Sequence, residues 1–298
     1  MSKTSIGPHP GVLRRRCGAF AAATLIAGPA CAGDDGGLLD LVNAYRSEPQ
    51  TCEGRRTDAA GPLAPARALA DAQIAADRPL LDALKAQGYQ AAQAHLIAVS
   101  GPGDAQAVMT LLQKRYCRPL LSPNFAEIGV SRQAERWTIV LARPQISADL
   151  GNWREAGHEI LRLANEARAQ PRTCGSRRFD AAPSLAWAPA LGAAALAHSR
   201  DMAERNIMRH RSSDGSQVGD RALREGYAWR QVGENVAAGQ GSPRQAMSAW
   251  LSSPPHCANV MHPGFAHMGA AYAMNPDSEA TIYWTQVFGT PRDAGRGR

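Results

Sequence analysis

The sequence predicts an α/β protein, an α–β–α sandwich that occurs twice in tandem. Three observations lead to this fold class. Apolar residues recur at helical spacing in the second half, two strand-like runs near its end flank a turn cluster, and a long segment of the first half recurs in the second. Helices that flank a small antiparallel sheet pack in layers on its faces, which gives the sandwich.

The second half is predicted to open on a helix over residues 159–169, followed by Pro171. The apolar residues at helical spacing in it are Ile160, Leu163, Ala164 and Ala167. An Ala-rich run over residues 190–206 predicts a second helix.

Two shorter helices follow. Residues 220–226 predict one that stops at Gly226. Ser242 as N-cap and Pro243 at the first helical position begin another, which runs to Pro254.

A β-hairpin closes the second half. Residues 269–274 and 281–288 are strand-like, and the turn cluster 275–278, rich in Asn, Pro, Asp and Ser, separates them.

The first half repeats the second. Residues 38–69 align with 160–191 without a gap at 17 identities in 32 positions, far above chance, and the match resumes after Cys117 and Cys257. Two tandem copies therefore span residues 36–146 and 152–292, with a boundary near Pro144 to Gly151. The first copy is degenerate, because it lacks a block in its middle. Residues 293–298 are expected to be a disordered tail.

Four cysteines lie outside the first 32 residues, an even number that favours disulfides in an exported protein. Each copy carries one early and one late cysteine, so the repeat favours the pairs Cys52–Cys117 and Cys174–Cys257. Each bond closes a loop of many tens of residues, worth roughly 4 kcal/mol in the chain-entropy model.

Residues 1–32 are predicted to be a secretory signal peptide. Arg14 to Arg16 form the charged region, residues 17–28 the apolar region, and Ala30-Cys31-Ala32 the cleavage site. A twin-arginine signal and a lipidated Cys31 stay open as alternatives. The expected location is secreted or periplasmic, and no later stretch is long and apolar enough to be a transmembrane helix.

The charge excludes a nucleic-acid-binding class. The net charge of +7 includes Lys3, Arg14, Arg15 and Arg16 of the signal, and subtracting these four leaves +3. No basic stripe interleaved with aromatic residues is present. A hydrophobic content of 44% suffices for a core and argues against a disordered chain.

A series of motifs runs through residues 157–292. In chain order they are Leu161-x-x-x-Asn165-x-x-Arg168, Ala195-x-x-His198-Ser199-x-Asp201-Met202-Ala203, His210, Gly233-Glu234-Asn235, Trp250-x-x-Ser253-x-x-His256-x-x-Asn259, and Tyr283-Trp284-Thr285-Gln286-x-Phe288. The series resembles the CAP superfamily (cysteine-rich secretory proteins, antigen 5 and pathogenesis-related 1; the SCP domain), in its bacterial secreted branch. The first copy shares the helix pattern and the cysteines of the second copy but lacks these motifs.

This resemblance implies an α–β–α sandwich with a cleft that holds two histidines and two acids. Carried over, the histidines are His210 and His256 and the first acid is Glu234. Ser253 stands where the second acid would be, so the set of four is incomplete. The resemblance further implies binding of divalent metals, sterols or lipids, or peptidase activity.

Two imidazoles and a carboxylate are a ligand set that suits Zn²⁺ or another divalent cation and leaves a position for water. Without metal, Glu234 would orient a histidine as a general base, although no nucleophile motif is visible. In the alternative interpretation, His210 and His256 are surface residues beside turns and Glu234 holds a loop.

Three further residues, Ser253, Asn259 and Gln286, are expected to support the cleft. His198 is predicted to be a half-buried helix histidine and not a ligand.

The first copy supports a site confined to the second. The block that it lacks contains the position of His210, Tyr116 aligns with His256, and no acid aligns with Glu234. The first copy is therefore expected to have a structural or partner-binding role.

The preferred function is a binding module that takes a divalent cation, a small molecule or a lipid. A hydrolase, specifically a peptidase that uses the same cleft, is the first alternative. A non-enzymatic protein that binds an envelope component or a partner is the second.

Overall fold

A computed structural model describes residues 37–74 and 77–292. The predicted signal peptide and C-terminal tail lie outside the described residues. Within the described ranges, none of the helices has the length and hydropathy of a membrane span.

The second half is built on a four-stranded sheet in the order β10-β12-β11-β9, in which β9 pairs parallel and the other strands antiparallel. Its elements are α6 (Trp153–Arg168), β7 (Arg172–Cys174), β8 (Arg177–Phe179), β9 (Ala186–Trp187), α7 (Pro189–Arg205), α8 (Val218–Arg224), β10 (Trp229–Ala238), α9 (Pro243–Leu251), α10 (Pro254–Met261), β11 (His267–Met274) and β12 (Ile282–Pro291). Strands β7 and β8 form a separate small ribbon.

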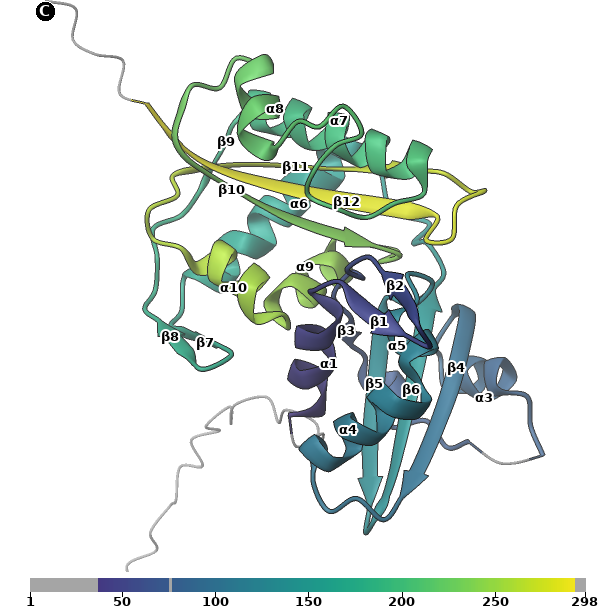
Figure 1. Ribbon diagram of the computed structural model, residues 1–298. Helices are drawn as coiled ribbons and strands as arrows, with labels where there is room; N and C mark the ends of the chain where they lie inside the picture. Colours follow the sequence, from purple (N-terminus) through teal and green to yellow (C-terminus); the bar gives the residue numbers. More distant parts are fainter. Residues whose placement is uncertain (1–36, 75–76, 293–298) are drawn as a thin grey trace, which may run out of the picture. The chain divides into compact units, whose positions relative to one another are not determined.

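Helices cover both faces of this sheet (Figure 1). Successive strand residues point to opposite faces. Accordingly, Ala270 of β11 packs in one cluster with Ile160 of α6 and Trp250 of α9, while Ala271 packs in another with Leu191 of α7. Helices α6, α9 and α10 therefore form one layer and α7 and α8 the other, which confirms the predicted α–β–α sandwich.

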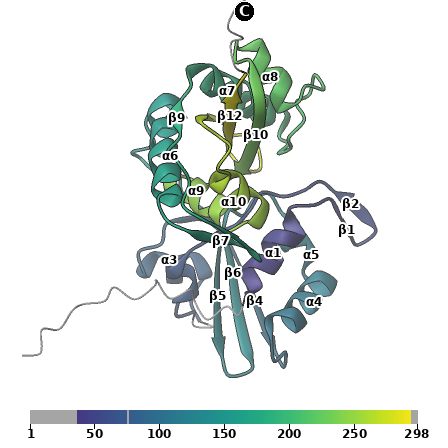
Figure 2. The ribbon, with the colours of Figure 1, turned by 90° about the vertical axis from the view of Figure 1, so that its left-hand side faces the viewer.

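The first half has a sheet of the same order, β4-β6-β5-β3. Its elements are α1 (Leu38–Arg46), β1 (Gln50–Cys52), β2 (Arg55–Thr57), β3 (Ala64–Pro65), α2 (Arg67–Ala70), α3 (Leu80–Ala86), β4 (Ala91–Ser100), α4 (Ala105–Arg115), α5 (Cys117–Leu121), β5 (Glu127–Gln133) and β6 (Arg136–Pro144). Figure 2 shows α1 and α4 on one side of its strands and α3 on the other. The four-residue α2 stands where the second half has the 17-residue α7, so the block missing from the sequence removes most of one helix.

The same buried polar bonds recur in both halves. Asn43 exchanges two hydrogen bonds with the backbone of Leu63, and Asn165 does so with Leu185. Each half also buries an arginine that donates to four backbone carbonyls. Arg46 donates to Gly61, Leu120, Ser122 and Phe125, and Arg168 donates to Pro183, Val260, His262 and Phe265. Tandem duplication stays a prediction, which these repeated bonds support.

The disulfides are those predicted from the repeat. Cys52 is bonded to Cys117, with 5.7 Å between their Cα atoms, and Cys174 to Cys257, with 5.6 Å. Each bond ties an early ribbon of one half, β1–β2 or β7–β8, to a later helix, α5 or α10.

Two of the predicted helices differ from the structure by three residues or more. Helix α6 begins earlier than residue 159, because Asn152 and Glu155 form a capping box at its start. The helix predicted to run to Pro254 stops at Leu251 as α9, and a further helix that was not predicted, α10, begins after Ser253.

Two of the candidate site residues lie within regular elements. His256 lies in helix α10, and Glu234 lies inside strand β10.

Hydrogen bonds join the two halves, which belong to one unit spanning residues 32–298. Asn43 Nδ2 donates to Ser252 O at 3.1 Å, and the fully buried Gln240 donates through Nε2 to Pro62 O at 3.0 Å. A backbone bond of 2.9 Å runs from Ser147 N to Gly241 O.

Candidate functional site

The predicted site residues meet around β10, a strand at the edge of its sheet. Alternation along β10 sends the side chain of Glu234 to the α7–α8 layer, where it meets Arg221. The next residue, Asn235, reaches the opposite layer and donates through Nδ2 to His256 O of α10 at 3.2 Å. At an uncovered edge, residues from both helical layers approach the same strand. The edge therefore explains how His210 and His256, from different layers, come to line one cavity.

Glu234 is a buried carboxylate with a partner on each oxygen. His210 Nδ1 lies 2.9 Å from Oε1, and Arg221 Nη2 lies 2.5 Å from Oε2. The Glu234 side chain is 2% exposed, whereas that of His210 is 61% exposed. Burial by itself would raise the pKa of the Glu234 carboxyl, but the hydrogen bond from His210 and the charge of Arg221 outweigh it, so the pKa lies below its ordinary value.

His198 is fully buried, which corrects the prediction of a half-buried side chain. Its Nε2 donates to Arg209 O at 2.7 Å, because a carbonyl only accepts. Its Nδ1 therefore accepts from Ser212 Oγ at 2.8 Å. Burial lowers the pKa of His198, which keeps the ring neutral. His198 thus anchors the segment that carries His210.

The second histidine, His256, is half-buried and bonded through Nδ1 to Ser253 Oγ at 2.7 Å. Burial, with the charge of His210 as a smaller cause, lowers the pKa of His256 to about 3. Ser253, at the position where an acid was expected by resemblance, therefore supports a histidine that is neutral at physiological pH.

Of the two amides predicted to support the cleft, Asn259 lines it and the fully buried Gln286 lies behind it. Asn259 donates through Nδ2 to Glu234 O at 3.1 Å and to Asn235 Oδ1 at 2.9 Å. Gln286 Oε1 accepts from Asn235 Nδ2 at 3.0 Å. These amides tie α10 to the backbone of β10 and β12 to the side chain of Asn235, so they fix the strand that carries Glu234.

Arg221 and Ser212 also belong to the site, although the sequence did not indicate them. Arg221 is 2% exposed and donates to Ser212 Oγ, Ser216 O and His210 O as well as to Glu234. A buried carboxylate requires a compensating cation. However, nothing in the sequence distinguishes Arg221 from the exposed Arg224 three residues later.

Each cleft histidine uses Nδ1 for a protein partner. Nδ1 of His210 donates to the carboxylate of Glu234, so the neutral tautomer with this bond has its lone pair on Nε2. In the described part of the chain, Nε2 of neither His210 nor His256 has a hydrogen-bond partner. The arrangement offers two imidazole nitrogens for a ligand.

The cavity that both histidines line has a volume of about 440 Å³, which is in the range of small-molecule sites. Its lining is Ser47, Glu48, Pro49, Asp58, Ala59, Ala60, Met208, Arg209, His210, Glu234, Val236, Pro255, His256 and Asn259. Six of these residues come from the first half of the chain. Ser253 is 1% exposed and is not among the lining residues.

A three-ligand metal site does not fit the geometry of these residues. Among residues 37–74 and 77–292, no group of three or more His, Cys, Asp or Glu side chains is arranged to hold a metal ion. Both oxygens of Glu234 already accept bonds from His210 and Arg221. Glu234 is placed to orient His210, as carboxylates do behind metal-binding histidines. The two Nε2 atoms remain for a cation.

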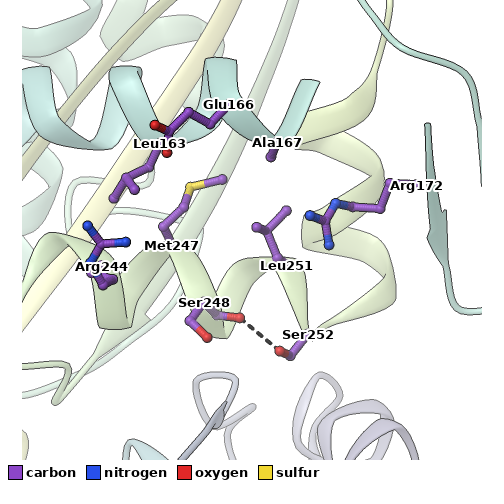
Figure 3. Close-up of a pocket in the computed structure, with 9 residues that line it drawn as sticks. All are labelled: Leu163, Glu166, Ala167, Arg172, Arg244, Met247, Ser248, Leu251 and Ser252. Atoms are coloured by element: carbon purple, nitrogen blue, oxygen red, sulfur yellow. Dashed lines mark hydrogen bonds between the residues drawn. The ribbon is translucent and has the colours of Figure 1, made fainter. Parts of the chain in front are cut away.

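A separate cavity of about 470 Å³ lies between α6 and α9 (Figure 3). Arg172 and Arg244 approach it from opposite ends, and Leu163, Met247 and Leu251 line the space between them. Nε of Arg172 is buried and has no hydrogen-bond partner in the described part of the chain. This cavity contains none of the predicted site residues.

Acid is expected to destabilise the cleft. The unfolded chain binds a proton at His256 near pH 6.5 and the folded chain near pH 3, so the stability that neutral His256 contributes falls as pH drops through this window. The lowered pKa of Glu234 has the same consequence, because the stability that its ionised carboxylate contributes is also lost as pH falls through the acidic range. Guanidinium unfolding at pH 7, 5.5 and 4 measures the effect. His256→Gln should show a shallower loss with acid than the native chain, and equal slopes would contradict the assignment.

Comparison with known proteins gives matches concentrated in the second half. Residues 161–288 match the model of the CAP family, described as the cysteine-rich secretory protein family. The uncharacterized protein YkwD of Bacillus subtilis (strain 168) is 30% identical over 125 residues, which cover 42% of this chain and 47% of the relative. The uncharacterized membrane protein YlbC of the same organism is 33% identical over 105 residues, 35% of this chain and 28% of the relative. The chain thus spans less than half the length of each.

Among solved structures, an extracellular protein containing a SCP domain from Bacillus anthracis str. Ames is similar at 17% identity and a TM-score of 0.40, covering 74% of this chain and 76% of that one. A cysteine-rich secretory protein from Staphylococcus aureus has 12% identity and a TM-score of 0.36, covering 51% and 50%.

Proposed function

We propose that this chain, whose residues 161–288 match the model of the cysteine-rich secretory protein (CAP) family, is an exported binding protein whose cleft holds a small ligand or a divalent cation between two histidines. Family membership alone specifies a fold, and function depends on the site. The observation that carries the proposal is the commitment of both Nδ1 atoms, which leaves Nε2 of His210 and His256 for a ligand in a 440 Å³ cavity.

Binding is favoured over hydrolysis. Ser253 and His256 form a hydrogen-bonded pair, but a nucleophile must reach its substrate. Ser253 is 1% exposed and does not line the cavity, so its hydroxyl is better explained as the support of His256.

Two disulfides support the proposal of export, since such bonds persist in oxidising compartments. The predicted signal peptide agrees with this location.

A lipid is the third ligand class expected from the sequence. The cavity between α6 and α9 suits a lipid better than the histidine cleft does. The cavity of Figure 3 combines cationic ends with an apolar middle, as an anionic amphiphile would require.

Zinc titration of the chain without residues 1–32 tests the cleft. The native protein is expected to bind one Zn²⁺ through His210 and His256, and replacing either histidine by alanine should weaken binding at least tenfold, because a two-imidazole site loses half of its protein ligands. Calorimetry at pH 7 gives the affinity, and histidine Cε1–H resonances identify the rings involved.

His95→Ala is the matched control, because His95 is an exposed histidine of the first half outside the cavity. It should leave zinc binding unchanged. Binding that survives in both His210→Ala and His256→Ala would place the metal elsewhere and remove the cation from the proposal.

A further inference from the structure

The first half of the chain supplies one wall of the cleft. Two of its segments line the cavity, residues 47–49 before β1 and residues 58–60 after β2. Both are held firmly: Cys52 of β1 is bonded to Cys117, and Ala60 N donates to Arg46 O at 2.8 Å. The wall is therefore a fixed part of the fold.

Close contacts hold this wall against the second half. A Cβ atom on Gly61 would lie 2.9 Å from Sδ of Met208, which itself lines the cavity, and 3.4 Å from Ala238 N. The neighbouring Pro62 accepts the bond from buried Gln240. The first half is thus positioned at the cleft by close packing at Gly61 and by a buried hydrogen bond at Pro62.

The charge of this wall is negative and uncompensated. Glu48 and Asp58 are exposed, and neither forms a hydrogen bond or an ion pair with any described residue. The third carboxylate of the cavity, Glu234, is already paired with Arg221. Arg209 is the one cationic side chain in the lining. Two free carboxylates against one cation give the cavity a negative potential.

We propose that the first half completes the binding site and that Glu48 and Asp58 select ligands that carry an ammonium group. This rests on the proposed function of the cleft and narrows its ligand class to small organic cations. The ammonium group lies against the wall of Glu48 and Asp58, and the aliphatic body lies along apolar lining such as Met208 and Val236. The first half is then a specificity element for a site whose histidines belong to the second.

Three probes of similar size and different charge test the proposal: n-butylammonium, butyramide and butyrate. Each is titrated into the chain without residues 1–32 at pH 7 and low salt, where charge effects are least screened. Shifts of the His210 and His256 ring resonances report binding in the cleft. The native protein is expected to bind butylammonium at least tenfold more tightly than either other probe.

The variant Glu48→Gln/Asp58→Asn removes both charges with little change of shape. Its preference for butylammonium over butyramide should fall at least fivefold, while its affinity for butyramide stays the same. The control Glu135→Gln/Asp82→Asn neutralises two exposed acids of the same half outside the cavity and should keep the native preference.

The outcomes separate this inference from the function on which it rests. If all three probes shift the histidine resonances with equal affinity, or if the cleft variant keeps the native preference, the charge selection is overturned and the binding function stands. If none of the probes shifts either resonance, this inference is overturned, and the binding function is overturned with it only if the zinc titration also fails.

Discussion

Replacing Arg221 by methionine is expected to destabilise the protein by about 3–5 kcal/mol, because it leaves the carboxylate of Glu234 buried and without its cation. Methionine fills the space of the aliphatic stem but donates no hydrogen bond. His210 O and Ser216 O lose their donor as well. Guanidinium unfolding with intact disulfides measures the loss, and the resonance of His210 should change because Glu234 no longer holds a fixed position behind it.

Arg224→Met is the matched control. Arg224 lies in the same helix and pairs with Asp214, but its side chain is 58% exposed, so the expected cost is below about 1 kcal/mol. The double variant Arg221→Met/Glu234→Gln removes the buried charge altogether and should be more stable than the sum of the two single losses predicts. Additive losses, or an Arg221→Met loss as small as that of Arg224→Met, would contradict the pairing.

Arg168→Met is expected to cost about 3–5 kcal/mol, since four backbone carbonyls lose one charged donor in the core. Arg46→Met should cost a similar amount in the first half. Burial lowers the pKa of Arg46 to about 9, which reflects how completely its guanidinium has left water. Free energies of unfolding from guanidinium denaturation measure both effects.

The control for this pair is Arg162→Met in helix α6. Arg162 is exposed and pairs with Glu159 and Glu166, so its loss is expected to stay below about 1 kcal/mol. An Arg168→Met variant as stable as Arg162→Met would show that water replaces the lost donor.

The layers of the fold could be predicted from local signals. The spacing of Ile160 and Leu163 marks a buried helix face, and the turn cluster at residues 275–278 marks a hairpin. Strand β10 was missed because it combines Gly233 with polar Glu234 and Asn235, so it lacks the alternation of a half-buried strand. Both faces of this edge strand are polar at the site, which is why the sequence pattern predicted no strand around Glu234.

Within the candidate site, the sequence predicted which residues gather but not what each one does. Ser253 was expected to stand in place of the second acid and to support the cleft, and the structure adds the partner of its hydroxyl, Nδ1 of His256. Glu234 was expected beside the histidines as a ligand and lies behind His210, paired with Arg221. Such roles depend on which atom of a side chain faces which neighbour, and spacing along the chain does not encode that.

By itself, the sequence determined the repeat, the pairing of the cysteines and the α–β–α class, because these follow from identities and periods within short segments. Only the tertiary structure decided that Arg221 compensates Glu234, that both cleft histidines bond to protein partners through Nδ1, and that residues 47–49 and 58–60 line the cleft. The physical reason is distance along the chain: these contacts join segments that meet only at the edge of β10, and the energy that selects them is burial and charge pairing across elements.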